Sequence, residues 1–110
     1  MGVLGEFEQL ILWAVLRLGA DAYGVRIAQE IEARTGRDVS PGAIYTALGR
    51  LEDRGLVVSS TESGGVGRAG RPRKFYRLEP DAARSLEESW NHISAMAEGQ
   101  VERLRRVGEG

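Results

Sequence analysis

The stretch from Ser40 to Glu79 constrains the fold most, because its pattern changes from helix to strand, then to a glycine-rich turn, and back to strand. Ser40 is a favoured helix N-cap, and Pro41 suits the first helical position, where an amide hydrogen would have no partner. A helix is therefore predicted from Pro41 to Arg54, and Gly55 supplies the left-handed residue that commonly follows a helix. The helical spacing of the apolar residues predicts a buried face made of Ile44, Ala47, Leu48 and Leu51.

The opposite face of this helix carries mostly small side chains. It consists of Gly42, Ala43, Tyr45, Thr46, Gly49 and Arg50. Each glycine inside a helix costs roughly 1 kcal/mol relative to alanine, so a bare surface must bring some gain. The pattern indicates close approach of another molecule to this side of the helix.

Two short β-type runs, Leu56–Val58 and Phe75–Leu78, flank the sequence GGVGRAGRPRK and are predicted to pair as a hairpin. Four cations lie within seven residues near its tip: Arg68, Arg71, Arg73 and Lys74. Such a cationic finger suits a DNA phosphate backbone or a narrow minor groove. A loop that is merely soluble is the alternative, and the density of cations beside glycines favours a groove-binding arm.

Positive charge is concentrated in this region, although the chain as a whole is nearly neutral. The 110 residues carry a formal net charge of -1. Residues 34–77 contain nine basic and four acidic residues, a net +5, whereas the segments before and after each carry -3. The local charge is what an approaching nucleic acid meets, so the overall acidity does not argue against such a partner.

Composition also limits the class of protein. The length fits one domain with a modest core. The chain has no cysteine, which excludes disulfide and thiolate–zinc frameworks and favours a reducing cytoplasm. No apolar run approaches the roughly 20 residues that a membrane span needs, and no leader peptide is recognisable. We expect a soluble cytoplasmic protein that does not contact a membrane.

Two helices are predicted before this region. The first runs from Gly5 to Leu18 and is apolar all the way round at its centre, so a second subunit is expected to cover one side; a helix central to its own core is the alternative. After a turn at residues 19–21, the second runs from Tyr23 to Thr35, with Ile27, Ala28 and Ile31 facing inward. Together with the helix at Pro41 this is a helix-turn-helix arrangement, which can place its second helix in a major groove.

The last helix is predicted to run as one helix from Pro80 to about Val107, about 42 Å at 1.5 Å per residue. An apolar stripe runs along this helix, which is longer than the small domain that precedes it. We therefore expect the stripe to pack against a second copy of the chain about a two-fold axis. The predicted interface comprises Leu12, Leu16, Leu86, Trp90, Ile93, Ala97, Val101 and Leu104. The expected domains are residues 1–79 and the dimerisation helix at residues 80–110.

No catalytic or metal-binding constellation is recognisable in the sequence. Gly65, Gly67 and Gly70 match the spacing of a dinucleotide-binding loop, but Pro72 and a strand follow, where that loop needs a helix. His92 is the only histidine and has no recognisable partner for metal binding or base catalysis. We expect no enzyme activity, no metal and no cofactor.

The chain resembles the PadR family of transcriptional regulators, in the subgroup with a single C-terminal helix. The matching segments are LGEFEQLILWAVLRLG, AYGVRIAQEIE, SPGAIYTALGRLEDRGLV and GRPRKFYRL, followed by the long closing helix. The resemblance implies a mainly α fold with a small β-hairpin, a winged helix-turn-helix, in a homodimeric regulator that is usually a repressor. Its third helix would enter the major groove of a near-palindromic double-stranded DNA operator, and its wing would touch the flanking backbone or minor groove.

The resemblance also implies site residues. The candidates for DNA binding are Ser40, Gly42, Tyr45, Thr46 and Arg50 on the helix, and Arg68, Arg71, Arg73 and Lys74 on the wing. Some members bind flat aromatic drugs or phenolic acids between the subunits, so a small aromatic ligand is a possible partner. Its candidate site comprises Gln9, Trp13, Trp90, Ile93 and Ser94.

Two alternatives stay open at this point. Trp13 and Trp90 either line a ligand slot or only pack the interface, and packing is the commoner role of aromatic residues on apolar stripes. The chain is either a regulator that binds DNA or an interaction module that kept the winged-helix shape without binding DNA. Loss of affinity and of salt dependence on removing wing cations would distinguish the two.

Overall fold

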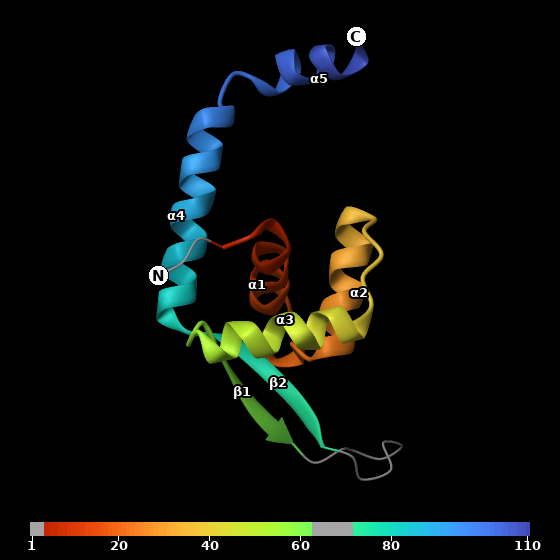
Figure 1. The fold of residues 1–110 in the computed structure, drawn as a ribbon, viewed down its shortest axis with the longest axis vertical. Coiled ribbons are helices and arrows are strands. Elements are labelled where there is room, and N and C mark those ends of the chain that lie inside the picture. The colour runs from red at the N-terminus through yellow and green to blue at the C-terminus, as the bar shows by residue number, and fades with distance from the viewer. Residues whose placement is uncertain (1–3, 63–71) are drawn as a thin grey trace.

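The chain folds as a winged helix-turn-helix with a helical extension (Figure 1). The computed structural model describes residues 4–62 and 72–110. In order, the elements are α1 (Glu6–Leu18), the short 3-10 helix η1 (Gly19–Asp21), α2 (Gly24–Thr35), α3 (Pro41–Asp53), β1 (Val57–Glu62), β2 (Arg73–Leu78), α4 (Pro80–Ala97) and α5 (Val101–Glu109). Helices α1, α2 and α3 pack together, the hairpin projects from below α3, and α4 rises beside α1 toward the C-terminus.

The helix ends follow from local sequence. The Ser40 side chain accepts a hydrogen bond from the Ala43 amide at 3.1 Å, so Ser40 caps α3 as the sequence predicts. At the start of α1, the Gly5 amide donates to the Glu8 carboxylate at 2.9 Å. Helix α2 ends at Gly36, whose φ of +74° is a left-handed conformation that glycine adopts without strain.

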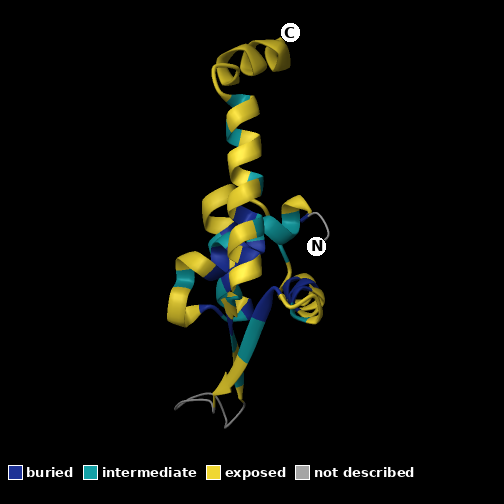
Figure 2. Ribbon diagram, turned by 90° about the vertical axis from the view of Figure 1, so that its left-hand side faces the viewer, coloured by how far each residue is buried: buried dark blue, intermediate teal, exposed yellow. Residues whose placement is uncertain are grey.

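One hydrophobic core joins the helices to the hairpin (Figure 2). The inward faces predicted for α2 and α3 are confirmed, since all seven of their predicted residues are buried. The core also takes in Ile11, Leu12, Ala14 and Val15 of α1, Tyr76 of β2, and Ala82 and Leu86 at the start of α4. The first turns of α4 therefore belong to the same core as the helices before them.

The hairpin is antiparallel and longer than predicted. Its register pairs Val57 with Leu78 at the root and Glu62 with Arg73 toward the tip. Polar residues extend both strands beyond the apolar runs, because an antiparallel pair tolerates a solvated face. In the middle of β2, Phe75 also forms a bridge with Tyr23, and the Tyr76 amide donates to the Ala22 carbonyl at 2.8 Å.

The prediction of one uninterrupted C-terminal helix is wrong. Helix α4 ends at Ala97, and α5 begins at Val101 and turns away from the axis of α4 (Figure 1). Between them Gly99 has a φ of +76°, a left-handed conformation that ends a helix. The Gln100 amide donates to the Ala97 carbonyl at 2.9 Å, which closes the turn. Within the described residues, no helix combines the length and apolarity needed to cross a membrane.

Candidate nucleic-acid interface

The open face of α3 is exposed as expected. Ser40, Gly42, Tyr45, Thr46 and Arg50 all lie at the surface. A Cβ atom added to Gly49 would meet no atom within 4 Å, so that part of the helix surface is bare. Among the described residues no carboxylate forms an ion pair with Arg50. This face therefore offers hydroxyl groups, one guanidinium and exposed backbone to a partner.

Tyr45 lies where α3 crosses the start of α2. Its side chain is 45% exposed, so it points partly outward. A Cβ atom added to Gly24 would lie 2.3 Å from the Tyr45 Cζ and 2.6 Å from its hydroxyl oxygen. A side chain at position 24 would have to displace this ring, so Gly24 is what lets the Tyr45 ring rest on α2.

The hairpin is tied to α3 through Glu52. One oxygen of this carboxylate accepts a hydrogen bond from the Ser59 hydroxyl at 2.6 Å, and the other lies 4.0 Å from the Lys74 ammonium. Both strands are thereby connected to the last turn of α3. Burial raises the pKa of the neighbouring Tyr76, and the charge of Glu52 and the Tyr45 phenol raise it further.

Arg73, at the start of β2 toward the hairpin tip, is engaged with an aromatic ring. Its guanidinium carbon lies 3.9 Å from the centroid of the Tyr23 ring, and Tyr23 in turn makes an edge contact with Phe75. The structure thus brings Arg73 and Lys74 close to Tyr45 of α3. Arg68 and Arg71 lie outside the described residues. Tyr23 and Glu52 were not predicted as site residues, because the sequence around each of them does not show which strand residues it contacts in the fold.

The residues proposed for ligand binding lie between α1 and α4. Trp13 and Trp90 are in edge-to-face contact, with ring centroids 6.4 Å apart and planes at 81°. The Gln9 side chain donates to the Leu4 carbonyl at 3.1 Å, and the Ser94 hydroxyl is buried with no hydrogen-bond partner among the described residues. Within one chain the two rings contact each other, so a flat ligand has no room between them.

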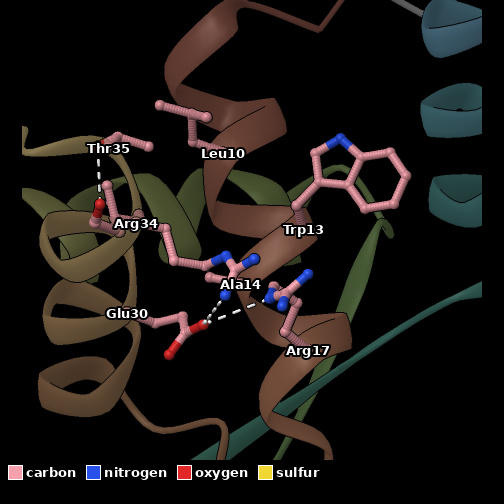
Figure 3. A pocket seen from close by; sticks show the side chains of 8 residues that line it. Leu10, Trp13, Ala14, Arg17, Glu30, Arg34 and Thr35 are labelled. Atoms are coloured by element: carbon pink, nitrogen blue, oxygen red, sulfur yellow. Dashed lines mark hydrogen bonds and ion pairs between the residues drawn. The ribbon is translucent and has the colours of Figure 1, made fainter.

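A separate hollow of about 190 Å³ lies between α1 and α2 (Figure 3). Ala14, Ile31 and Leu10 supply apolar walls, and Trp13 stands at its edge. On its rim the Glu30 carboxylate lies 3.3 Å from Arg17 Nε and 4.0 Å from the Arg34 guanidinium. One carboxylate is thus shared by two guanidinium groups, so the rim keeps a net positive charge.

The residues proposed for the dimer interface divide into two groups. Leu12 and Leu86 are 0% and 3% exposed and pack inside the chain's own core, so the interface proposed below does not include them. An uncovered group lies mainly on α4 and α5 (Figure 2): Leu16, Trp90, Ile93, Val101 and Leu104, with Ala97 half-buried. Met96 and Val107, which the sequence reasoning did not include, are also exposed.

No group of three or more potential metal ligands occurs within residues 4–62 and 72–110. The described part of the chain also contains no convergent set of nucleophile and base. The distinctive surfaces of the described residues are the open α3 face, the start of β2 and the apolar side of α4 and α5.

Comparison with known proteins agrees with this architecture. Residues 12–101 match the transcriptional regulator PadR-like family. The chain belongs to this family. Its members are transcriptional regulators, so this PadR-like protein is a regulator and not an enzyme.

Individual relatives support the same assignment. The chain is 35% identical over 77 residues to the transcriptional regulator Rv3488 of Mycobacterium tuberculosis, covering 70% of this chain and 67% of the relative. It is 29% identical over 85 residues to the transcriptional activator GvpE2 of Halobacterium salinarum, covering 77% of this chain but only 39% of that protein. A PadR family regulator from Clostridium difficile R20291 superimposes with a TM-score of 0.68 at 26% identity, over 91% of this chain and 99% of the other.

Proposed function

We propose that this PadR-like chain acts as a homodimer that binds a near-palindromic double-stranded DNA operator and represses transcription. The observation that carries the proposal is the pairing of a bare, exposed α3 face with cations at the start of β2 in the adjoining hairpin. Ser40, Gly42, Tyr45, Thr46 and Arg50 are assigned to the major groove, and Arg68, Arg71, Arg73 and Lys74 to the flanking DNA. Two α3 helices about 34 Å apart would meet successive major grooves.

The proposed dimer interface is the apolar side of α4 and α5. Trp90 and Ile93 are each 58% exposed and Leu104 is 70% exposed, which is unusual for large apolar residues on one side of a helical extension. These residues line or adjoin a hollow of about 470 Å³ at the bend between the two helices. A second copy of the chain would cover this surface through a two-fold, self-complementary contact.

We also propose that a small aromatic ligand binds at this interface and releases the operator. Trp90 and Ile93 are exposed there, Trp13 contacts Trp90, and the buried Ser94 hydroxyl has no partner among the described residues. Gln9 completes the candidate set. A ligand controls DNA binding only if it prefers one arrangement of the two subunits, because equal affinity for both arrangements shifts nothing.

Selection of genomic fragments on the immobilised protein, followed by sequencing, tests the DNA-binding proposal. Enrichment of fragments that share an inverted repeat is the expected result. Recovery of fragments with no common sequence would favour an interaction module. Transcription from an enriched promoter, measured with and without the protein, then gives the sign of regulation, and increased transcription would contradict repression.

Titration with planar aromatic compounds tests ligand control. The expected result is quenching of tryptophan fluorescence together with release of the selected operator. Quenching without release would contradict the control proposed here. A chemically diverse panel that causes no quenching would leave Trp13 and Trp90 with a packing role alone.

A further inference from the structure

A hollow of about 400 Å³ lies between the start of α2, the outer face of α3 and the start of β2. It is lined by Tyr23, Val25, Tyr45, Pro72, Arg73 and Lys74. None of these residues is acidic, and each polar side chain among them is able to donate a hydrogen bond. The hollow therefore presents donors and positive charge beside the exposed face of α3.

Arg73 lines this hollow from the start of β2, where Glu62 is its cross-strand partner. Its guanidinium stacks on the Tyr23 ring at 3.9 Å, and this ring is braced by Phe75, with centroids 5.5 Å apart and planes at 71°. Stacking covers a face of the guanidinium and leaves donors at its edge for bidentate contacts. Among the described residues no carboxylate pairs with Arg73, and its Nε is buried without a hydrogen-bond partner.

Three arginines on other surfaces of the chain are held differently. Arg17, Arg37 and Arg54 each lie 3.0–3.3 Å from a glutamate carboxylate. Arg37 also lies over an aromatic ring, that of Phe7 at 5.4 Å, but its glutamate partner neutralises it locally. The aromatic support of Arg73 does not neutralise its charge. The contrast indicates that the charge of Arg73 is kept for an anion from outside the chain.

The surroundings of Arg73 also favour an anion. The first turn of α2 contains no acidic residue, and Tyr23 provides no side-chain cap to its free amides. That end of the helix therefore carries a partial positive charge. Lys74 is half exposed and lies 4.0 Å from Glu52, a loose contact that leaves its ammonium able to turn toward the hollow.

We propose that this hollow binds one phosphate of the DNA backbone, contacted by Arg73, Lys74 and the Tyr45 hydroxyl. Tyr23 is a positioning residue, because it orients Arg73 through its ring. The inference rests on the proposed DNA binding and assigns Arg73 a sequence-independent contact in place of minor-groove reading. Contacts of this kind fix the register of a protein on the duplex.

The test measures binding of the full chain to two fluorescein-labelled duplexes of unrelated sequence, by anisotropy, at several concentrations of KCl between about 50 and 200 mM. Arg73→Gln is expected to weaken both duplexes by the same factor and to reduce the salt slope of log K by about 0.9, the value for one lost phosphate contact. Arg73→Lys is expected to keep the slope and lose part of the affinity, because a lysine does not reproduce the stacked, bidentate geometry.

Tyr23 is tested by a pair of substitutions. Tyr23→Phe keeps the ring and is expected to bind like the unmodified chain, whereas Tyr23→Leu is expected to weaken both duplexes. Thermal unfolding of each variant identifies a loss of DNA affinity that comes from misfolding. If Tyr23→Leu does not fold, the Arg73 variants decide the proposal. Arg84→Gln is the control, because it removes the same charge from an exposed pair with Asp81 on α4.

Two outcomes separate this inference from the function on which it rests. An unchanged salt slope in Arg73→Gln, or a loss confined to one duplex, overturns the phosphate site while leaving DNA binding in place. Failure of the unmodified chain to bind either duplex at low salt overturns DNA binding itself, and the phosphate site with it.

Discussion

Among single residues, the helical glycines Gly24 and Gly49 are expected to respond in opposite ways to the same substitution. Gly49 has open space around it, so Gly49→Ala should stabilise the fold by about 0.5–1 kcal/mol, as expected for replacing a glycine inside a helix. A Cβ atom on Gly24 would lie 2.3 Å from Tyr45, so Gly24→Ala must displace that ring. We expect a loss of about 1–3 kcal/mol, measured by urea unfolding.

A second substitution isolates the cause of that loss. In a Tyr45→Ala background the obstructing ring is absent, so Gly24→Ala should cost nothing or stabilise the chain. An equal loss in both backgrounds would show that the contact between Gly24 and Tyr45 is not responsible.

Tyr76 makes stability depend on pH in the alkaline range. Burial, with the charge of Glu52 and the Tyr45 phenol, raises the pKa of Tyr76 above its ordinary value of 10.0. The folded chain therefore holds this proton more tightly than the unfolded chain. The contribution to stability is present below pH 10 and is lost as the pH rises through the folded-state pKa.

Tyr76→Phe should accordingly show a smaller loss of unfolding free energy between about pH 9 and pH 11 than the unmodified chain. The measurement is denaturant unfolding at a series of pH values, followed by circular dichroism. Parallel profiles for the two proteins would show that Tyr76 titrates alike in the folded and unfolded chains.

Helices and strands followed from sequence wherever the signal was local. The cap at Ser40 and the buried spacing of Ile44 and Leu48 define α3 without reference to the rest of the chain. The break between α4 and α5 was missed because Ala97 and Val101 are four residues apart, so the apolar stripe keeps its spacing across Gly99. The spacing of apolar residues alone does not reveal a single residue whose backbone adopts the left-handed conformation.

The same limit applies to the candidate site. The exposed residues of α3 were predictable from the helical pattern, since it assigns each position to one face. The contact of Tyr23 with Arg73 depends on how the hairpin crosses the start of α2. The sequence therefore shows which residues are cationic, but tertiary packing determines which cation lies against an aromatic ring.

Gly99 is expected to control the bend between α4 and α5. Gly99→Ala places a side chain where φ is +76°, which costs roughly 1–2 kcal/mol for an L-residue in the left-handed region. A continuous helix through residues 98–100 relieves that strain, so the helical signal at 222 nm should increase. Gly108→Ala within α5 is the control, because Gly108 has no positive φ and open space around it. Equal spectra for the two variants would show that Gly99 does not set the bend.

The chain as a unit is elongated, with principal extents of 54 × 30 × 20 Å, and its apolar residues are divided between two places. One set fills the core that α1, α2, α3, the hairpin and the start of α4 share, and the other lies exposed along α4 and α5. The proposed DNA-binding surface is at the opposite end of the molecule from α5 (Figure 1). Pairing through α4 and α5 would therefore join two copies while leaving both α3 faces open.

Substitution on the exposed apolar side tests this arrangement. Ile93→Glu places a charge where burial of a large aliphatic side chain is worth about 1.5–3 kcal/mol. Because a two-fold dimer carries the change twice, its dissociation constant should rise by roughly a hundredfold or more, measured by light scattering over a concentration series. Val25→Glu is the matched control, because Val25 is 41% exposed but lies on α2 beside the start of β2, away from α4 and α5. A dimer unaffected by Ile93→Glu would contradict the interface, as would an unmodified chain that stays monomeric at micromolar concentration. In that case each monomer would contact only one half of the proposed operator, through its single α3.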